Sequence, residues 1–149
     1  MNTHHKFLFE PGIWLGEGKV QLSVSEDDLR FFTRWNIGKQ KEKGVIDSSQ
    51  EIEIKGLQDK SKNLLIFTPL GEDEFKVELE NENIGKVQGK GLIRPKLIAW
   101  EFRSLDKVFE GFEVYELLED GSYFMHAEYI NKEELRTQIQ GKIWKKLTS

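Results

Sequence analysis

Apolar and polar residues alternate along almost the whole chain, from Gly12 to Leu147. In the segment 97–102, for example, Ile98, Trp100 and Phe102 fall on one side of an extended backbone. A period of two residues is the spacing of side chains on one face of a β-strand. Glycine, asparagine and acidic residues interrupt the alternation at short intervals, as is typical of turns between antiparallel strands. The pattern therefore predicts an all-β protein.

The interruptions divide the chain into ten expected strands, at 12–24, 29–37, 45–57, 64–68, 75–79, 84–93, 97–102, 108–117, 122–129 and 137–147. Asp120-Gly121 is a strong hairpin signal between two of them. Parallel pairing would need crossovers of about a dozen residues or more, and the connections are shorter. Ten successive strands close most economically into a single antiparallel up-and-down β-barrel, which leaves no edge exposed. A two-sheet sandwich is the alternative.

We expect one domain over residues 1–149, in which the N-terminal segment 1–11 covers one end of the barrel. Segments 25–28 and 131–135 each begin with a capping residue followed by acidic residues, which predicts helices of one or two turns at most. His4 and His5 precede the first strand, and we expect them to belong to a mobile terminus.

Composition excludes several kinds of site. The chain has no cysteine, which removes disulfides, thiolate metal sites and cysteine nucleophiles. Its formal net charge of −4 argues against a nucleic-acid partner, because duplex binding relies on clustered Lys and Arg. No run approaches the roughly 20 apolar residues of a membrane span, and the first residues do not resemble a signal peptide. We therefore expect a soluble, cytoplasmic protein.

The strand expected at 122–129 carries large side chains on both faces. Tyr123, Met125, Ala127 and Tyr129 alternate with Phe124, His126, Glu128 and Ile130. A sheet with one face in water should show one polar face. We expect one face to line a cavity of mixed polarity, and the other to be covered in part by Phe7-Leu8-Phe9 or by another subunit. The alternative interpretation is a packed core with scattered surface rings.

The segment Gly12-Ile13-Trp14-Leu15-Gly16-Glu17-Gly18 reads GxWxGxG at the start of the first strand. It resembles the opening of calycin-type barrels, since lipocalins carry Gly-x-Trp there, and nitrobindin-like barrels carry a tryptophan followed by alternating glycines. On physical grounds, Trp14 can close one barrel end. Gly16 and Gly18 allow sharp bending, or close approach of a neighbouring backbone or ligand.

The chain departs from each of these families in a different way. Fatty-acid-binding proteins insert a two-helix lid after the first strand, where this chain has only 25–28. Lipocalins have eight strands and a helix near the C-terminus, which 137–149 does not resemble. The lidless nitrobindin-like plan is most similar in outline, but the strand expected at 137–147 lacks the histidine that binds haem in that family. The cofactor is therefore left unknown; a haem here would need His126, a tyrosine or a methionine as its axial ligand.

The leading functional hypothesis is a barrel that binds a small hydrophobic or amphipathic ligand. A second is a structural or protein-interaction barrel that uses an aromatic outer face, including a homo-oligomer. A third is an enzyme with a carboxylate or histidine in the cavity, Glu128 or His126 in particular, although the sequence assigns no catalytic residue and no metal ligand. The candidate ligand-binding residues are Trp14, Arg34, Trp35, Trp100, Glu101, Glu113, Tyr115, His126 and Glu128.

Overall fold

The computed structural model describes residues 5–57, 60–104, 109–131 and 133–147, and contains ten β-strands. They are β1 (Gly12–Leu22), β2 (Leu29–Ile37), β3 (Ile46–Ile54), β4 (Ser61–Pro69), β5 (Glu74–Asn81), β6 (Gly85–Arg94), β7 (Leu97–Ser104), β8 (Phe109–Leu117), β9 (Tyr123–Ile130) and β10 (Arg136–Lys145). All ten expected strands are present, with ends that differ from the expected ones by a few residues. Val108, expected to begin the eighth strand, lies outside the described residues.

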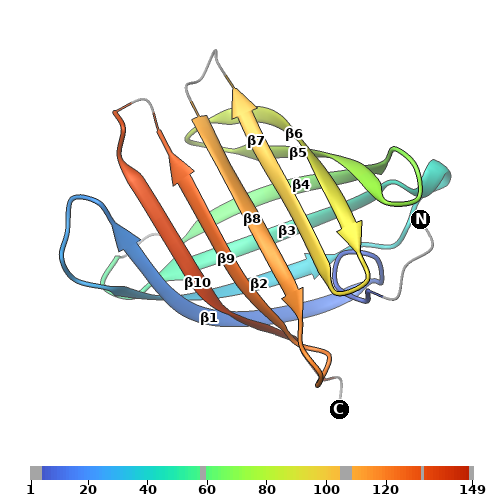
Figure 1. Cartoon of the computed structure of the whole chain (residues 1–149), viewed down its shortest axis with the longest axis horizontal. Helices are drawn as coiled ribbons and strands as arrows, with labels where there is room; N and C mark the ends of the chain where they lie inside the picture. Colours follow the sequence, from blue (N-terminus) through green and yellow to red (C-terminus); the bar gives the residue numbers. More distant parts are fainter. Residues whose placement is uncertain (1–4, 58–59, 105–108, 132, 148–149) are drawn as a thin grey trace.

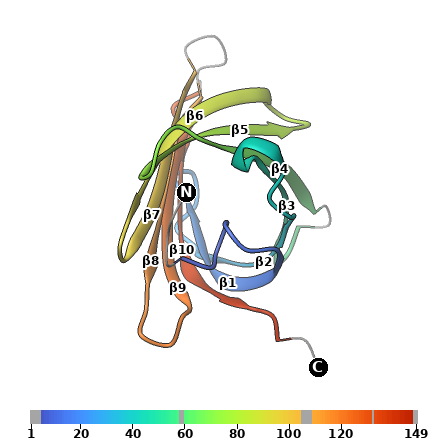
Figure 2. The ribbon, with the colours of Figure 1, turned by 90° about the vertical axis from the view of Figure 1, so that its right-hand side faces the viewer.

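Every strand pairs with its neighbours in the sequence in antiparallel orientation, and β1 also pairs with β10 (Figure 1). The sheet is therefore a closed barrel, which Figure 2 shows close to end-on. The expected fold class, an all-β up-and-down barrel of ten strands, is confirmed, and the two-sheet sandwich is wrong. Closure satisfies the hydrogen-bonding groups of both terminal strands, which an open sheet would expose.

Neither of the two short helices forms in the described residues. The expected capping residues hold turns instead: the Ser25 hydroxyl accepts from the Asp27 amide, and the Asn131 side-chain oxygen accepts from the amides of Glu133 and Leu135. Such local bonds compete with helix formation. The one helical element of the described chain is a short 3₁₀ turn, Glu42–Gly44, between β2 and β3.

The glycines of β1 lie where strands approach too closely for a side chain. A Cβ atom on Gly18 would lie 2.1 Å from the carbonyl oxygen of Gln140 on β10. A Cβ on Gly16 would lie 2.6 Å from the side chain of Ile143, which is also on β10. The close approach of a neighbouring backbone expected from the GxWxGxG segment is therefore present at the β1–β10 seam that closes the barrel.

The N-terminal segment enters one end of the barrel. Phe7 and Leu8 are fully buried, and Phe7 packs against the rings of Trp14, Trp35, Tyr115 and Tyr123. His5 is also buried, at 3% exposure, so the expected mobile terminus is wrong for this residue. His4 lies outside the described residues. The expectation that Phe7-Leu8-Phe9 covers the outer face is likewise wrong, because these apolar side chains bury more surface among the aromatic rings inside.

Candidate functional site

The barrel encloses a cavity of about 650 Å³. Exposed residues of the β3–β4 and β5–β6 connections, among them Lys60 and Glu82, belong to its lining, so the cavity reaches the surface at that end. At the other end Phe7 contacts the lining residues Trp35 and Tyr115 and forms a floor. The space is therefore a pocket with one entrance. Its size lies within the roughly 300–1,000 Å³ of ordinary small-molecule sites.

His5 holds this floor in place. Its Nε2 donates a hydrogen bond to the Arg94 carbonyl oxygen (2.6 Å), and its Nδ1 lies 2.7 Å from the Tyr123 hydroxyl. A carbonyl oxygen can only accept, so in the neutral ring Nδ1 accepts from Tyr123. These bonds connect the N-terminal segment to β6 and β9 across 89 and 118 positions of sequence. They offset the cost of burying an imidazole.

Glu113 is the one acidic side chain that is buried among the described residues, at 8% exposure, and it lines the cavity. Its Oε1 accepts a hydrogen bond from the Tyr115 hydroxyl (2.5 Å), and its Oε2 accepts one from the Tyr129 hydroxyl. The carboxyl group is thus held by one hydroxyl on each oxygen.

The strand register places the three groups together. Glu113 and Tyr115 are two positions apart on β8, so their side chains leave the same face. Tyr129 on β9 is paired with Gly111, and its ring occupies the space where a Gly111 side chain would be, since a Cβ there would lie 2.1 Å from Tyr129 Cδ1. The ring also stacks on Phe109 (centroids 5.4 Å apart). Gly111 therefore makes room for the tyrosine that reaches Glu113.

Burial dominates the electrostatics of this group. It raises the pKa of Glu113 above its ordinary value, and the side-chain donors Tyr115, Tyr129 and Trp100 oppose that shift. The pKa of each tyrosine is raised well above its ordinary value, first by burial and then by the negative charge of Glu113. Both tyrosines accordingly stay protonated and act as donors near neutral pH.

A chain of polar side chains lines the wall formed by β2–β5. Gln50 Nε2 donates to the Thr33 hydroxyl, Asn63 Nδ2 donates to Gln50 Oε1, and Asn81 Nδ2 donates to Asn63 Oδ1, each at 3.1 Å. All four residues line the cavity. Each amide nitrogen carries a second N–H, which these bonds do not use. The wall therefore carries amide N–H groups that these three bonds leave unused.

The two polar groups face each other across the barrel. Around the closed ring, β8 and β9 lie five strands from β3 and β4, which is halfway round, and Figure 2 shows the two pairs on opposite sides. Between them the cavity is lined by apolar residues, among them Phe31, Ile52, Leu79, Met125 and Ile139. The walls between the two groups are thus largely apolar, with a carboxyl group on one side and amides on the other, and charged residues such as Lys60 and Glu82 lie at the entrance.

Three of the nine residues predicted for the site line the cavity, namely Trp35, Glu113 and Tyr115. Trp14 and Trp100 are buried in the aromatic core beside it, where Trp100 stacks on Tyr115 at 5.0 Å. The indole N–H groups of Trp14 and Trp35 have no acceptor among the described residues. That of Trp100 makes no hydrogen bond of ordinary geometry, but it lies near enough to the Glu113 carboxyl group to lower the pKa of that group.

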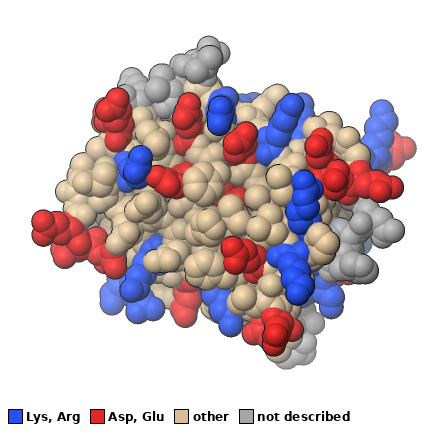
Figure 3. Space-filling model, in the orientation of Figure 1, with Lys and Arg blue, Asp and Glu red and all other residues tan. Residues whose placement is uncertain are grey.

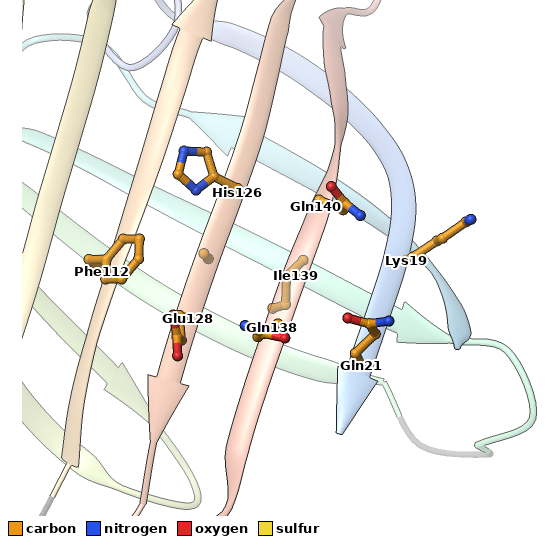
Figure 4. A pocket seen from close by; sticks show the side chains of 9 residues that line it. Lys19, Gln21, Phe112, His126, Glu128, Gln138, Ile139 and Gln140 are labelled. Carbon is orange, nitrogen blue, oxygen red and sulfur yellow. The ribbon is translucent and has the colours of Figure 1, made fainter. Parts of the chain in front are cut away.

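The other four predicted residues, Arg34, Glu101, His126 and Glu128, point outward. His126 and Glu128 line a shallow groove on the outer face with Phe112 (Figure 4), and Glu128 pairs with Arg136 at 2.8 Å. The physical reason is the period of two: Met125, Ala127 and Tyr129 fill the inner face of β9, which sends their neighbours outside. His126 is therefore not available to a ligand or haem in the cavity, and the enzyme site expected at Glu128 or His126 does not lie inside the barrel. Of the predicted carboxylate and histidine residues, Glu113 is the one that lines the cavity.

The outer face of β7–β10 carries aromatic side chains that are exposed to solvent. Phe112 and Phe124 are 38% and 37% exposed and both contact the His126 ring, with centroids 6.1 and 6.2 Å away. Figure 3, which views this face, shows uncharged side chains at its centre and charged ones around them. The expectation that both faces of these strands carry large groups is met, and no segment of the described chain covers the outer one.

Sequence reasoning missed Tyr129, the amide chain and His5. A usable signal for Tyr129 was its place on the same face as Met125, opposite a glycine of the preceding strand. No local pattern marks His5, because its partners are far away in the sequence. Among the described residues, no group of three His, Asp or Glu is arranged to hold a metal ion, and no helix is long and apolar enough to cross a membrane.

The fold and cavity define a closed ten-stranded β-barrel with an internal pocket. No protein-family model matches the chain, and no curated protein sequence matches it. Among solved structures, the S-type phycobiliprotein lyase CPES from Guillardia theta is similar, with a TM-score of 0.68 over 94% of this chain and 90% of that one, at 10% sequence identity. At this identity the likeness supports the lipocalin-like barrel fold and no more.

Proposed function

We propose that this protein is a calycin-type barrel that binds a small amphipathic ligand in its internal cavity. The observation that carries the proposal is the pocket of about 650 Å³, whose interior combines apolar walls with two hydrogen-bonded polar groups and whose entrance carries charged residues such as Lys60 and Glu82. Pockets with this composition hold a ligand by apolar burial and orient it with a few polar contacts. The similar barrel from Guillardia theta is named as a phycobiliprotein lyase, which is compatible with a small ligand.

The first test is native mass spectrometry and an absorbance spectrum of the protein as purified. We expect a retained small molecule, because a largely apolar pocket of this size favours an apolar occupant over water. Fluorescence of Nile red, a neutral apolar dye, then reports on the cavity itself. We expect one dye to bind per protein.

Two tryptophan variants locate the dye. Met125 lines the cavity, and Phe124, one position earlier on β9, points into solvent. Met125→Trp fills the pocket and should weaken Nile red binding about tenfold or more, whereas Phe124→Trp should leave it nearly unchanged. Equal affinity in the two variants would refute binding in the barrel interior.

A second candidate function rests on the outer face. Phe112 on β8 and Phe124 on β9 are both exposed and contact the His126 ring that lies between them, and rings of this kind are enriched in protein interfaces. We infer that this face supports a protein contact, including a homo-oligomer. Light scattering over a concentration series, with wild type and Phe112→Asp, tests it. A wild type that stays monomeric at all concentrations would refute self-association through this face.

A further inference from the structure

We propose that Glu113, held by Tyr115 and Tyr129, is a subsite for a protonated nitrogen of the ligand. This inference rests on the proposed function and adds the chemical class of the ligand, an amphipathic amine. Three observations support it: the charge that Glu113 leaves unbalanced, the acceptor sites that remain on its oxygens, and the apolar space beside it.

No Lys, Arg or His nitrogen in the described parts of the chain lies within 4.0 Å of the Glu113 carboxyl oxygens. The donors beside them are the Tyr115 and Tyr129 hydroxyls and the Trp100 indole, and none of these carries a positive charge. Burying a carboxylate without a counter-ion is costly, so the site favours either a proton or a cation. A ligand cation would supply the missing charge.

The oxygens also have acceptor sites to spare. A carboxylate has about four lone-pair sites; the two tyrosines use one on each oxygen, and the Trp100 indole N–H accounts for at most one more. Glu113 belongs to the cavity lining, so the unused sites are accessible from the pocket. An ammonium group with several N–H donors matches such an arrangement, whereas a carboxylate ligand would be repelled by it.

The rest of the cavity suits the apolar part of such a ligand. Leu79, Met125 and Ile139 are among the apolar residues that line it beyond Glu113. The amides of Gln50 and Asn63 on the opposite wall can donate to an acceptor at the far end of a longer molecule. The arrangement therefore orients an amine with its nitrogen on β8 and its apolar body along the barrel.

Displacement of Nile red by three probes of equal chain length tests the inference: decylamine, decanol and decanoate. We expect decylamine to bind about 10- to 100-fold more tightly than decanol, as for a hydrogen bond to a charged group, and decanoate to bind most weakly. Glu113→Gln should remove the advantage of decylamine and leave Nile red and decanol binding within about threefold of wild type. Glu116→Gln, an exposed carboxyl three positions along the same strand, is the matched control and should change nothing.

A measurement on the unmodified protein makes the test independent of whether the variant folds. The titratable groups that face Glu113 are Tyr115 on β8 and Tyr129 on β9, and both stay neutral below their raised pKa values. Decylamine remains charged in acid. Lowering the pH through the Glu113 pKa, in a series that begins in mildly alkaline buffer, should therefore weaken decylamine binding to the level of decanol, whose affinity should stay constant while the barrel remains folded.

The outcomes separate the two proposals. If Nile red and decanol bind in the cavity but decylamine shows no advantage in wild type, the amine subsite is wrong and the proposed ligand-binding function stands. If decylamine is preferred equally by wild type and Glu113→Gln, the subsite is again wrong, because another group provides the preference. If none of the probes or the dye binds, the proposed function itself fails.

Discussion

Replacing Phe7 with alanine should reveal how far the N-terminal segment contributes to the stability of the barrel. Phe7 is fully buried and lies within 4.9–5.5 Å, between ring centroids, of four aromatic side chains of the barrel. Truncating a buried phenylalanine to alanine costs about 3–5 kcal/mol, as the sum of lost transfer free energy and the void that remains. The rings around Phe7 belong to four different strands, β1, β2, β8 and β9, and cannot collapse into that void, so we expect a value in this range.

Urea unfolding followed by tryptophan fluorescence measures the free energy of unfolding of wild type and Phe7→Ala. For a chain of this length the expected loss corresponds to a fall in Tm of roughly 10 °C. Phe124→Ala, which removes a ring that is 37% exposed on the outer face, is the control and should cost less than about 1 kcal/mol. A Phe7→Ala variant as stable as Phe124→Ala would refute the conclusion that the segment is part of the core.

Three further results are expected. Gly18→Ala should destabilise the protein by about 1–3 kcal/mol in urea unfolding, because the added methyl group meets the Gln140 carbonyl oxygen at the seam that closes the barrel; wild-type stability would contradict this. The pKa of every tyrosine of the chain is raised, chiefly by burial, so the folded state holds these protons more tightly than the unfolded state does. The free energy of unfolding should therefore keep this contribution in full below the unfolded-state pKa near 10 and lose it as the pH rises above that value. Phenolate absorbance should then appear together with unfolding, and a separate transition near the ordinary pKa in the folded barrel would contradict the burial. Hydrogen bonds from Ser122 lower the pKa of Asp120 to about 2, which an NMR titration of its carboxyl carbon should show; an ordinary value would mean that this turn is not closed as described.

Local patterns predicted most of the architecture. The alternation along the chain identified all ten strands, because side chains on a pleated strand must alternate and turns need residues such as Asp120-Gly121. Local capping patterns were less informative at Ser25 and Asn131, whose side chains can bond a nearby amide in a turn as well as in a helix. Choosing between those two outcomes depends on the strands on either side, which fix both ends of these short connections.

The candidate site could be predicted only in part. Trp35, Glu113 and Tyr115 were identified because large and charged groups on strand faces suggest a lined interior. His126 and Glu128 were placed with them, since both faces of their strand carry large side chains and the period of two does not say which face is inside.

The sequence by itself determined the strands, their antiparallel order and the closed barrel, since these depend on spacing between neighbours along the chain. Tertiary structure alone decided which strand faces enclose the cavity. It also decided the hydrogen bond between Tyr129 and Glu113 and the one between His5 and Tyr123, which are 118 positions apart. The physical reason is that the inside of a closed barrel is set by the register and curvature of all its strands together. Contacts across that interior join residues whose distance in the sequence carries no local signal.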